Sequence, residues 1–243
     1  MNRIDTRFAE LASTGRTGLI PFITAGDPSL EATVPVMHAL VQAGADVIEL
    51  GTRRVFEFVR AFRETDTQTP VVLMGYLNPV EIYGLERYAK DAAAAGVDGL
   101  LLVDCPPEEA DDVQAVLRAN GLHQICLAAP TSGAERLVRL VETSSGYLYY
   151  VSFAGVTGAA QLQTDAVREQ VSAIKALGHL PVAVGFGVRD GASAKALAQS
   201  ADAVVIGSAL VQALADATDA QDAAARARGF LAPIRVALNT DRA

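Results

Sequence analysis

Glu49 is the residue of this sequence whose surroundings most directly favour proton transfer. It is the one carboxylate in the apolar run VIEL (47–50), which is followed at once by Gly51. Burial among apolar side chains disfavours the charged form of a carboxyl group and so raises its pKa towards the range useful for general acid and base catalysis. A structural carboxylate that pairs with a neighbouring strand would have the same pattern, and these residues alone favour neither interpretation.

Three glycine-containing turns late in the chain predict a phosphate site. They are GVTGA (155–159), GFGV (185–188) and GS (207–208), and each follows an apolar run of strand length. Backbone N–H groups at such turns and at helix N-termini bind phosphate, and glycine allows close approach of the backbone. One such glycine alone usually makes only a tight turn, but three successive turns favour phosphate. The predicted phosphate ligands are Gly158, Gly187, Gly207 and Ser208.

Aromatic side chains near the same strand ends would enclose a flat aromatic ligand, although core packing is the commoner role of any single one. These side chains are Phe22, Tyr76, Tyr149 and Phe186. The other polar candidates have simpler explanations. Helix N-capping explains Asp27, Asp104 and Asp190 at least as well as catalysis does. The three histidines, His38, His123 and His179, lack the spacing of metal ligands, so we predict no metal site.

The elements that must position these residues alternate along the whole chain. Short apolar runs rich in β-branched residues alternate with longer Ala-rich segments of helical spacing, which is typical of parallel strands covered by helices. Nearly all of the runs are apolar on both faces, as expected for strands between a barrel interior and a helical layer. The eight predicted strands are 19–25, 46–50, 70–75, 99–104, 124–129, 147–153, 181–186 and 203–208.

Eight such pairs predict an α/β fold, a (β/α)8 TIM barrel formed by residues 1–243 as a single domain. An extra N-terminal helix over 3–14 would close the barrel floor, and a helix over 220–238 would complete the outer ring. A doubly wound sheet is the alternative, but its first turn would need a GxGxxG pattern, and the first turn here is TAGDPS. The glycines predicted to end helices in the left-handed conformation are Gly44, Gly96, Gly121, Gly146 and Gly178.

The composition disfavours several classes of protein. Twenty Lys and Arg residues against 28 Asp and Glu give a net charge of −8, which argues against binding to nucleic acid or anionic membranes. The start of the chain lacks the apolar stretch of a secretory signal, and no apolar run approaches the roughly 20 residues of a membrane span. We therefore expect a cytoplasmic protein. Cys105 and Cys126 are expected to be small buried hydrophobes rather than a disulfide or metal ligands.

Eight segments, in order and covering nearly the whole chain, carry a resemblance to a known family. The segments are PFITAGDPSLE (21–31), GADVIELG (44–51), MGYLNPV (74–80), DGLLLVDCPPEE (98–109), APTS (129–132), YYVSFAGVTGA (149–159), PVAVGFGV (181–188) and ADAVVIGSALV (201–211). Together they resemble the tryptophan synthase alpha chain family, and ADVIELG, GVTGA and GFG are specific in combination.

The resemblance implies a retro-aldol cleavage of indole-3-glycerol phosphate to indole and glyceraldehyde 3-phosphate. It implies no cofactor, since the indole ring accepts electrons once it is protonated at C3. Glu49 matches the carboxylate that protonates this carbon and takes the proton of the glycerol hydroxyl. The four predicted phosphate ligands match the phosphate site, and Thr157 lies in a mobile loop that closes on the substrate. The residues that match the indole pocket are Phe22, Leu73, Tyr76, Leu101, Tyr149 and Phe186.

The resemblance also implies an alpha2beta2 assembly with a pyridoxal-phosphate beta chain.

One segment of this chain departs from the family pattern. After the glycine that matches Gly51, the family continues with a Pro-Phe-Ser-Asp-Pro type loop and a short helix. This chain goes straight to TRRVFEFVRAF (52–62), which matches a later helix. The missing segment carries the second catalytic carboxylate, an Asp that holds the indole N–H, and part of the surface facing the beta chain. Glu57 is the nearest acidic residue, and a solvated helix face explains it better.

Two functions remain open at this point. The first is the lyase, although losing one of two cooperating carboxylates would be expected to cost orders of magnitude in rate. The alternative is a catalytically impaired barrel, a loop-deleted variant or paralogue, that binds phosphate ligands and binds or regulates a beta chain. A sugar-phosphate isomerase of histidine or tryptophan synthesis is a third class, but it would be expected to place a base on the first strand. There PFITAGD has no acid or thiol inside the strand.

Overall fold

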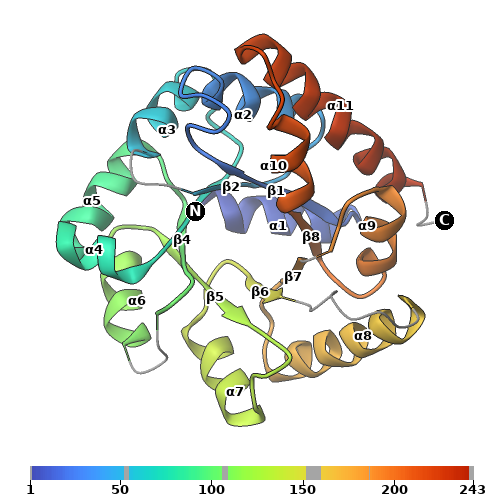
Figure 1. Cartoon of the computed structure of the whole chain (residues 1–243). Coiled ribbons are helices and arrows are strands. Elements are labelled where there is room, and N and C mark those ends of the chain that lie inside the picture. Colours follow the sequence, from blue (N-terminus) through green and yellow to red (C-terminus); the bar gives the residue numbers. More distant parts are fainter. Residues whose placement is uncertain (1, 52–54, 106–108, 152–159, 186, 241–243) are drawn as a thin grey trace.

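Eight parallel strands form a closed barrel in which β8 pairs with β1 (Figure 1). The computed structural model describes residues 2–51, 55–105, 109–151, 160–185 and 187–240. The predicted TIM barrel is confirmed, and the doubly wound alternative is wrong, because such a sheet has two open edges. The strands are β1 (Gly18–Thr24), β2 (Ile48–Gly51), β3 (Val71–Gly75), β4 (Gly99–Leu102), β5 (His123–Ala128), β6 (Leu148–Val151), β7 (Val182–Gly185) and β8 (Ala203–Ile206).

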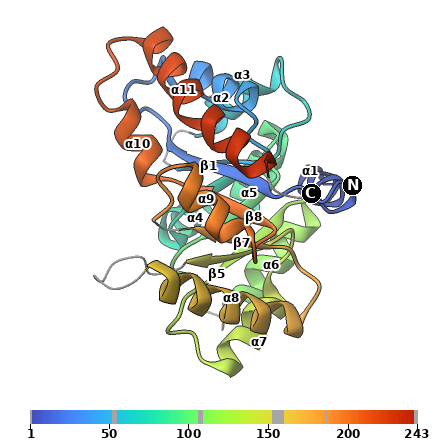
Figure 2. The ribbon, with the colours of Figure 1, turned by 90° about the vertical axis from the view of Figure 1, so that its right-hand side faces the viewer.

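Helices surround this barrel, and α1 lies across one end of it. Figure 2 shows α1 at one end of the molecule and α10 at the other. The helices of the described residues are α1 (Arg3–Ser13), α2 (Thr33–Gln42), α3 (Val55–Arg63), α4 (Leu77–Tyr83), α5 (Leu85–Ala95), α6 (Ala110–Ala119), α7 (Ala134–Thr143), α8 (Ala160–Leu177), α9 (Gly191–Ala198), α10 (Ser208–Leu214) and α11 (Ala220–Asn239). The predicted first and last helices are confirmed to within one residue. None of these helices combines the length and apolar character that a membrane span needs.

Helix ends follow the sequence prediction with one exception. Gly44, Gly96, Gly121 and Gly146 all have φ between 73° and 98°, as predicted for left-handed helix ends. The prediction for Gly178 is wrong, because its φ lies outside this region. Glycine serves there for a close approach instead: a Cβ atom at this position would lie 2.6 Å from the Val141 side chain of α7.

The capping predictions for the aspartates have mixed outcomes. Asp190 caps α9, and its side chain accepts a hydrogen bond from the Ser193 N–H. Asp104 caps a different helix from the one predicted, since it accepts from the Leu77 N–H at the start of α4, 2.7 Å away. Asp27 does not cap the next helix, because α2 begins after Ala32. The loop after β4 thus caps the helix that follows the neighbouring strand β3. Proximity in the sequence does not predict such a cap.

The strands separate two apolar layers because their side chains alternate between faces. An inner cluster fills the barrel with small and branched side chains such as Val72, Leu101 and Ala183. The side chains of Ile4 and Phe8 belong to the same cluster, so α1 closes the barrel floor as predicted. Two outer clusters pack the other faces of the strands against the helices.

Three buried or half-buried aspartates tie the floor of the barrel together. Asp46, Asp98 and Asp202 precede β2, β4 and β8, and each accepts the backbone N–H of a residue in the preceding strand, at 2.8 to 2.9 Å. Each also has a basic partner at 2.9 Å. The sequence analysis did not single them out. The recurring pattern GAD (44–46), GVD (96–98) and SAD (200–202) at the helix-to-strand turns would have indicated them.

Replacing Asp98 with Asn is expected to lower the free energy of unfolding by about 2 kcal/mol. The buried carboxylate accepts hydrogen bonds from Val71, Arg63 and Arg3. An amide has only one acceptor oxygen, so one guanidinium would face an N–H2 group, and the Arg63 charge would lose the nearer of its two carboxylate partners and keep only Asp66, 3.9 Å away. Burial already lowers the pKa of Arg63 to about 10, which shows how much this charge depends on its surroundings.

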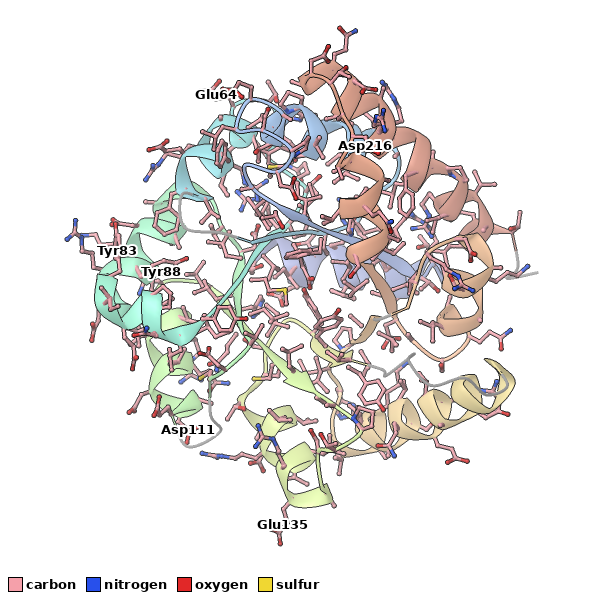
Figure 3. All side chains as sticks on the ribbon, viewed as in Figure 1. Glu64, Tyr83, Tyr88, Asp111, Glu135 and Asp216 are labelled. Carbon is pink, nitrogen blue, oxygen red and sulfur yellow. The ribbon has the colours of Figure 1, made fainter. Side chains whose placement is uncertain are left out.

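Urea denaturation monitored by circular dichroism measures this loss. The matched control is Asp111→Asn on α6, at the outer edge of the molecule in Figure 3. Asp111 pairs with Arg139 on the surface, and its side chain is 56% exposed, so its loss is expected to cost less than about 0.5 kcal/mol. Equal losses for the two variants would contradict the structural role of Asp98.

Candidate active site

Glu49 lies inside the barrel and is completely buried. It stands on the same face of its chain segment as Val47, which belongs to the inner cluster, whereas Ile48 and Leu50 face the helices. Its Oε1 accepts a hydrogen bond of 2.7 Å from the hydroxyl of Tyr147, one residue before β6 on the opposite side of the barrel. Burial raises the pKa of Glu49 to about 7, and this hydrogen bond opposes the rise.

The second carboxyl oxygen of Glu49, Oε2, differs from Oε1 in its hydrogen bonding. Oε2 is buried and has no hydrogen-bond partner among the described residues. Burial, and after it the charge of Glu49, raises the pKa of Tyr149, so both groups hold their protons more firmly than in water. A carboxyl group with a pKa near neutrality and one free oxygen is able to give and take a proton at the pH of the cell.

Two predicted aromatic residues lie close to the strand ends that face the mouth of the barrel. Phe22 lies between the ends of β2 and β8, because a Cβ atom on Gly51 would lie 3.1 Å from its ring and one on Gly207 would lie 3.5 Å away. Tyr149 packs onto the inner cluster and reaches the end of β7, where a Cβ atom on Gly185 would lie 2.3 Å from its hydroxyl. The absence of a side chain at Gly51 and at Gly185 therefore leaves room for the two rings, whereas 3.5 Å at Gly207 is an ordinary contact.

The other predicted pocket residues are more dispersed. Leu101 is fully buried in the inner cluster. Leu73 lies on the opposite face of β3 and packs in the outer cluster, while its neighbour Met74 packs against the inner one. Tyr76 is 63% exposed at the rim, and Phe186 lies outside the described residues. The prediction that Leu73 and Leu101 face the same space therefore needs correction, because side chains alternate along a strand and Met74 occupies the inward position.

The predicted phosphate ligands that the structure describes follow two adjacent strands, β7 and β8. Gly187 is exposed with φ of 76°, a conformation that favours glycine. Gly207 is the N-cap residue of α10, and the exposed Ser208 is the first residue of that helix. The first N–H groups of a helix have no partner within it and attract anions. Gly158 and Thr157 lie outside the described residues.

A cavity of about 730 Å³ opens beside the rim between β1 to β4 and the helices α3 to α5. Phe22, Leu73 and Tyr76 line it. The sequence analysis missed its aromatic wall, Phe56, Tyr83 and Tyr88, whose ring centroids lie 5.0 to 6.3 Å apart. Figure 3 shows Tyr83 and Tyr88 together at the edge of the molecule. The three residues lie on different helices, α3, α4 and α5, so no spacing along the chain predicts that their rings meet.

The remaining predictions concern metals, thiols and Glu57. No group of three metal-binding side chains occurs among the described residues. Cys126 is buried, as predicted, whereas Cys105 is half-buried. Glu57 is exposed on α3, as predicted for a solvated helix face.

Comparison with known proteins gives a consistent result. The sequence model of the family "Tryptophan synthase alpha chain" matches residues 8–53 and 52–236. The tryptophan synthase alpha chain of Xanthomonas oryzae pv. oryzae (strain MAFF 311018) is 55% identical over 266 positions, covering 98% of this chain and 99% of that protein. The alpha chain of Xylella fastidiosa (strain M12) is 53% identical over 265 positions, with the same coverage.

Solved structures agree in fold. Tryptophan synthase subunit alpha from Legionella pneumophila str. Paris has a TM-score of 0.90 and 40% identity, covering 99% of this chain and all of that one. A chain of tryptophan synthase from M. tuberculosis in an aminoacrylate-bound form has a TM-score of 0.85 and 32% identity, covering 98% and 100%.

The same comparisons bear on the missing segment. An alignment of 266 positions is longer than the 243 residues of this chain, so the relative has residues that this sequence lacks. The family model matches in two segments that meet and overlap at residues 52–53, just after Gly51. Nothing in these comparisons favours the alternative of an impaired ligand-binding barrel. With a family match over most of its length and relatives at 53 to 55% identity, the chain belongs to the tryptophan synthase alpha chain family, a family of lyases that cleave indole-3-glycerol phosphate.

Proposed function

We propose that Glu49 carries out the proton transfers when this chain cleaves indole-3-glycerol phosphate. The observation that supports this role best is the buried carboxyl group, with its pKa near 7 and its unpartnered Oε2, inside a barrel of this family. Protonation of the indole ring needs an acid, and removal of the glycerol hydroxyl proton needs a base. One carboxyl group whose pKa is close to neutrality is able to perform both in turn.

The phosphate end of the substrate would bind at the turns after β7 and β8. Gly187 would offer a backbone N–H after β7, and Gly207 and Ser208 would offer N–H groups and a hydroxyl at the start of α10. Gly158 would complete the site, and the loop containing Thr157 would close over it, as the resemblance implies. The Phe22 ring lies next to Gly207 and the Tyr149 hydroxyl next to Gly185, so the indole ring would lie near these two side chains.

The wider setting is also part of the proposal. The chain would act as a single domain in the cytoplasm, without a cofactor of its own, and would deliver indole to a tryptophan synthase beta chain in an alpha2beta2 assembly. Membership of the alpha chain family and the structural likeness to a chain of M. tuberculosis tryptophan synthase support this partnership.

The overall activity is tested by measuring indole release from indole-3-glycerol phosphate, with and without an added beta chain. An intact mass that agrees with 25.4 kDa would first establish that the protein lacks the segment after Gly51. We expect indole in both assays, and more with the beta chain. Substrate binding without indole release in either assay would contradict the proposed function.

Replacing Ser208 with Asp is expected to raise KM about thirtyfold while kcat changes little. A carboxylate at the first position of α10 would repel the phosphate dianion and compete for the same N–H groups. Steady-state kinetics measures the effect, and inorganic phosphate should lose its ability to inhibit the variant. The matched control is Ser13→Asp, an exposed serine at the end of α1 on the opposite face of the barrel, for which no change is expected. An unchanged KM in the Ser208 variant would remove this residue from the phosphate site.

A further inference from the structure

We propose that Tyr147 is a positioning residue for the cleavage, which holds Oε1 of Glu49 so that Oε2 is the oxygen that exchanges protons with the substrate. The inference rests on the proposed function of Glu49 and deepens it. It concerns a contact between residues 98 positions apart, in elements that face each other across the barrel.

The ring of Tyr147 is fixed from the floor of the barrel. The side chain is completely buried, and its ring centroid lies 5.5 Å from that of Phe8 on α1. Its hydroxyl is its only polar side-chain atom, and this hydroxyl donates to Oε1 at 2.7 Å. A buried tyrosine hydroxyl needs a partner, so the contact restrains both side chains.

The two oxygens of Glu49 therefore have different tasks. Oε1 accepts from the hydroxyl of Tyr147, whose ring packs against α1. Helix α1 closes the floor of the barrel, at the amino-terminal ends of the strands. Oε2 is buried without a partner among the described residues. A buried acceptor without a partner costs free energy, and such atoms are retained at functional sites where a ligand supplies the missing hydrogen bond. The substrate would enter from the carboxyl ends of the strands and contact Oε2.

Few other charges are able to influence this carboxyl group. The titratable side chains that face it among the described residues are Tyr147 and Tyr149, and the inner cluster is otherwise apolar. Because the Tyr147 hydroxyl stabilises the carboxylate, it keeps the pKa of Glu49 below the value that burial alone would set. Removing this hydroxyl would therefore raise the pKa of Glu49 further.

Tyr147→Phe is expected to lower kcat about tenfold, to leave KM unchanged, and to move the pH midpoint that reports Glu49 to higher pH by at least about half a unit. KM should not change, because the Tyr147 ring packs against Phe8 of α1 at the floor of the barrel, whereas the proposed phosphate turns follow β7 and β8 at the other end of these strands. The matched control is Tyr150→Phe on β6, a buried tyrosine whose ring faces the helices, for which no pH shift is expected. A Tyr147→Phe enzyme with the kcat and pH profile of the wild type would overturn the proposal.

A second measurement separates this inference from the proposed function and needs no folded variant of Tyr147. Wild-type protein labelled with 13C at the tyrosine Cζ is titrated by NMR, and the Tyr147 resonance is expected to shift as Glu49 ionises near pH 7. The shift should vanish in Glu49→Gln. A titrating Tyr147 together with full turnover of Glu49→Gln would refute the catalytic role of Glu49 and not the contact. A Tyr147 resonance that ignores pH would refute the positioning role itself.

Discussion

Replacing Glu49 with Gln is expected to slow indole release about a thousandfold. Glutamine keeps the shape of the side chain and can still accept the hydrogen bond from Tyr147. It is unable to donate a proton to the indole ring or to accept one from the glycerol hydroxyl, and general acid and base groups contribute about 10² to 10⁴ in rate. The decrease should appear in kcat, because the phosphate turns that set binding are untouched.

The same variant carries its own test of folding. The pKa of Glu49 is raised in the folded protein from its ordinary 4.5 to about 7, so its stabilising contribution is complete below about pH 4.5 and is lost as the pH rises through 7. Ionised Glu49 then costs up to about 3 kcal/mol at pH 8. The free energy of unfolding, measured with urea, should therefore change in favour of Glu49→Gln between pH 5 and pH 8. The difference between the variant and the wild type should be larger at pH 8 than at pH 5.

The control for both measurements is Glu57→Gln, an exposed carboxylate on α3. It should change neither turnover nor the pH dependence of unfolding. If Glu49→Gln releases indole at the wild-type rate, the general acid and base role is refuted, whatever its stability. If it is slow but also unfolds more easily at pH 8, the loss of rate would reflect misfolding instead of chemistry.

The barrel could be predicted from the sequence because each strand has a local pattern. Runs such as 70–75 and 203–208 are apolar on both faces and are bounded by polar turns. The structure has strands within both runs, β3 and β8. Ends were less certain. The prediction that the last strand reaches residue 208 is wrong, because Gly207 is the N-cap residue of α10 and Ser208 is its first residue. A βα turn and a strand end have the same apolar and glycine-rich composition, so the sequence does not distinguish them.

Side-chain direction was harder to predict than the element. A shift of one residue in β3 turns an inward side chain outward, and Leu73 and Met74 are both apolar, so composition cannot distinguish them. The contact between Tyr147 and Glu49 could not be predicted at all. The segment YLYYV offers three tyrosines, and only closure of the barrel decides which of them meets Glu49.

The departure after Gly51 has a structural consequence. Helix α3 begins at Val55, so the path from the end of β2 to this helix is very short. The cavity of about 730 Å³ extends from Gly51 and Val55 to the aromatic residues of α4 and α5. It therefore lies next to the point in the chain where the family's additional segment would begin. The proposed active site would therefore open into this cavity, and the sequence lacks the segment that carries the second carboxylate implied by the family resemblance.

Inserting the corresponding segment of the Xanthomonas oryzae relative after Gly51 is expected to raise kcat about a hundredfold. The segment would bring the family's Asp to the indole N–H, where it would stabilise the positive charge that develops when the ring is protonated. It would also cover the cavity and exclude water from the reacting groups, which strengthens every charge interaction inside. Indole release by the insertion variant and by the original chain is measured side by side, each with and without the beta chain.

The matched control carries the same insertion with Asn in place of its Asp. This control separates the carboxylate from the wall, because both insertions fill the same space and differ in one charge. A hundredfold gain with Asp and a small gain with Asn would assign the missing rate to the second carboxylate. Equal gains would assign it to exclusion of water. No gain from either insertion would mean that Glu49 already works at full rate in the shortened site, and the family's two-carboxylate scheme would then not apply to this chain.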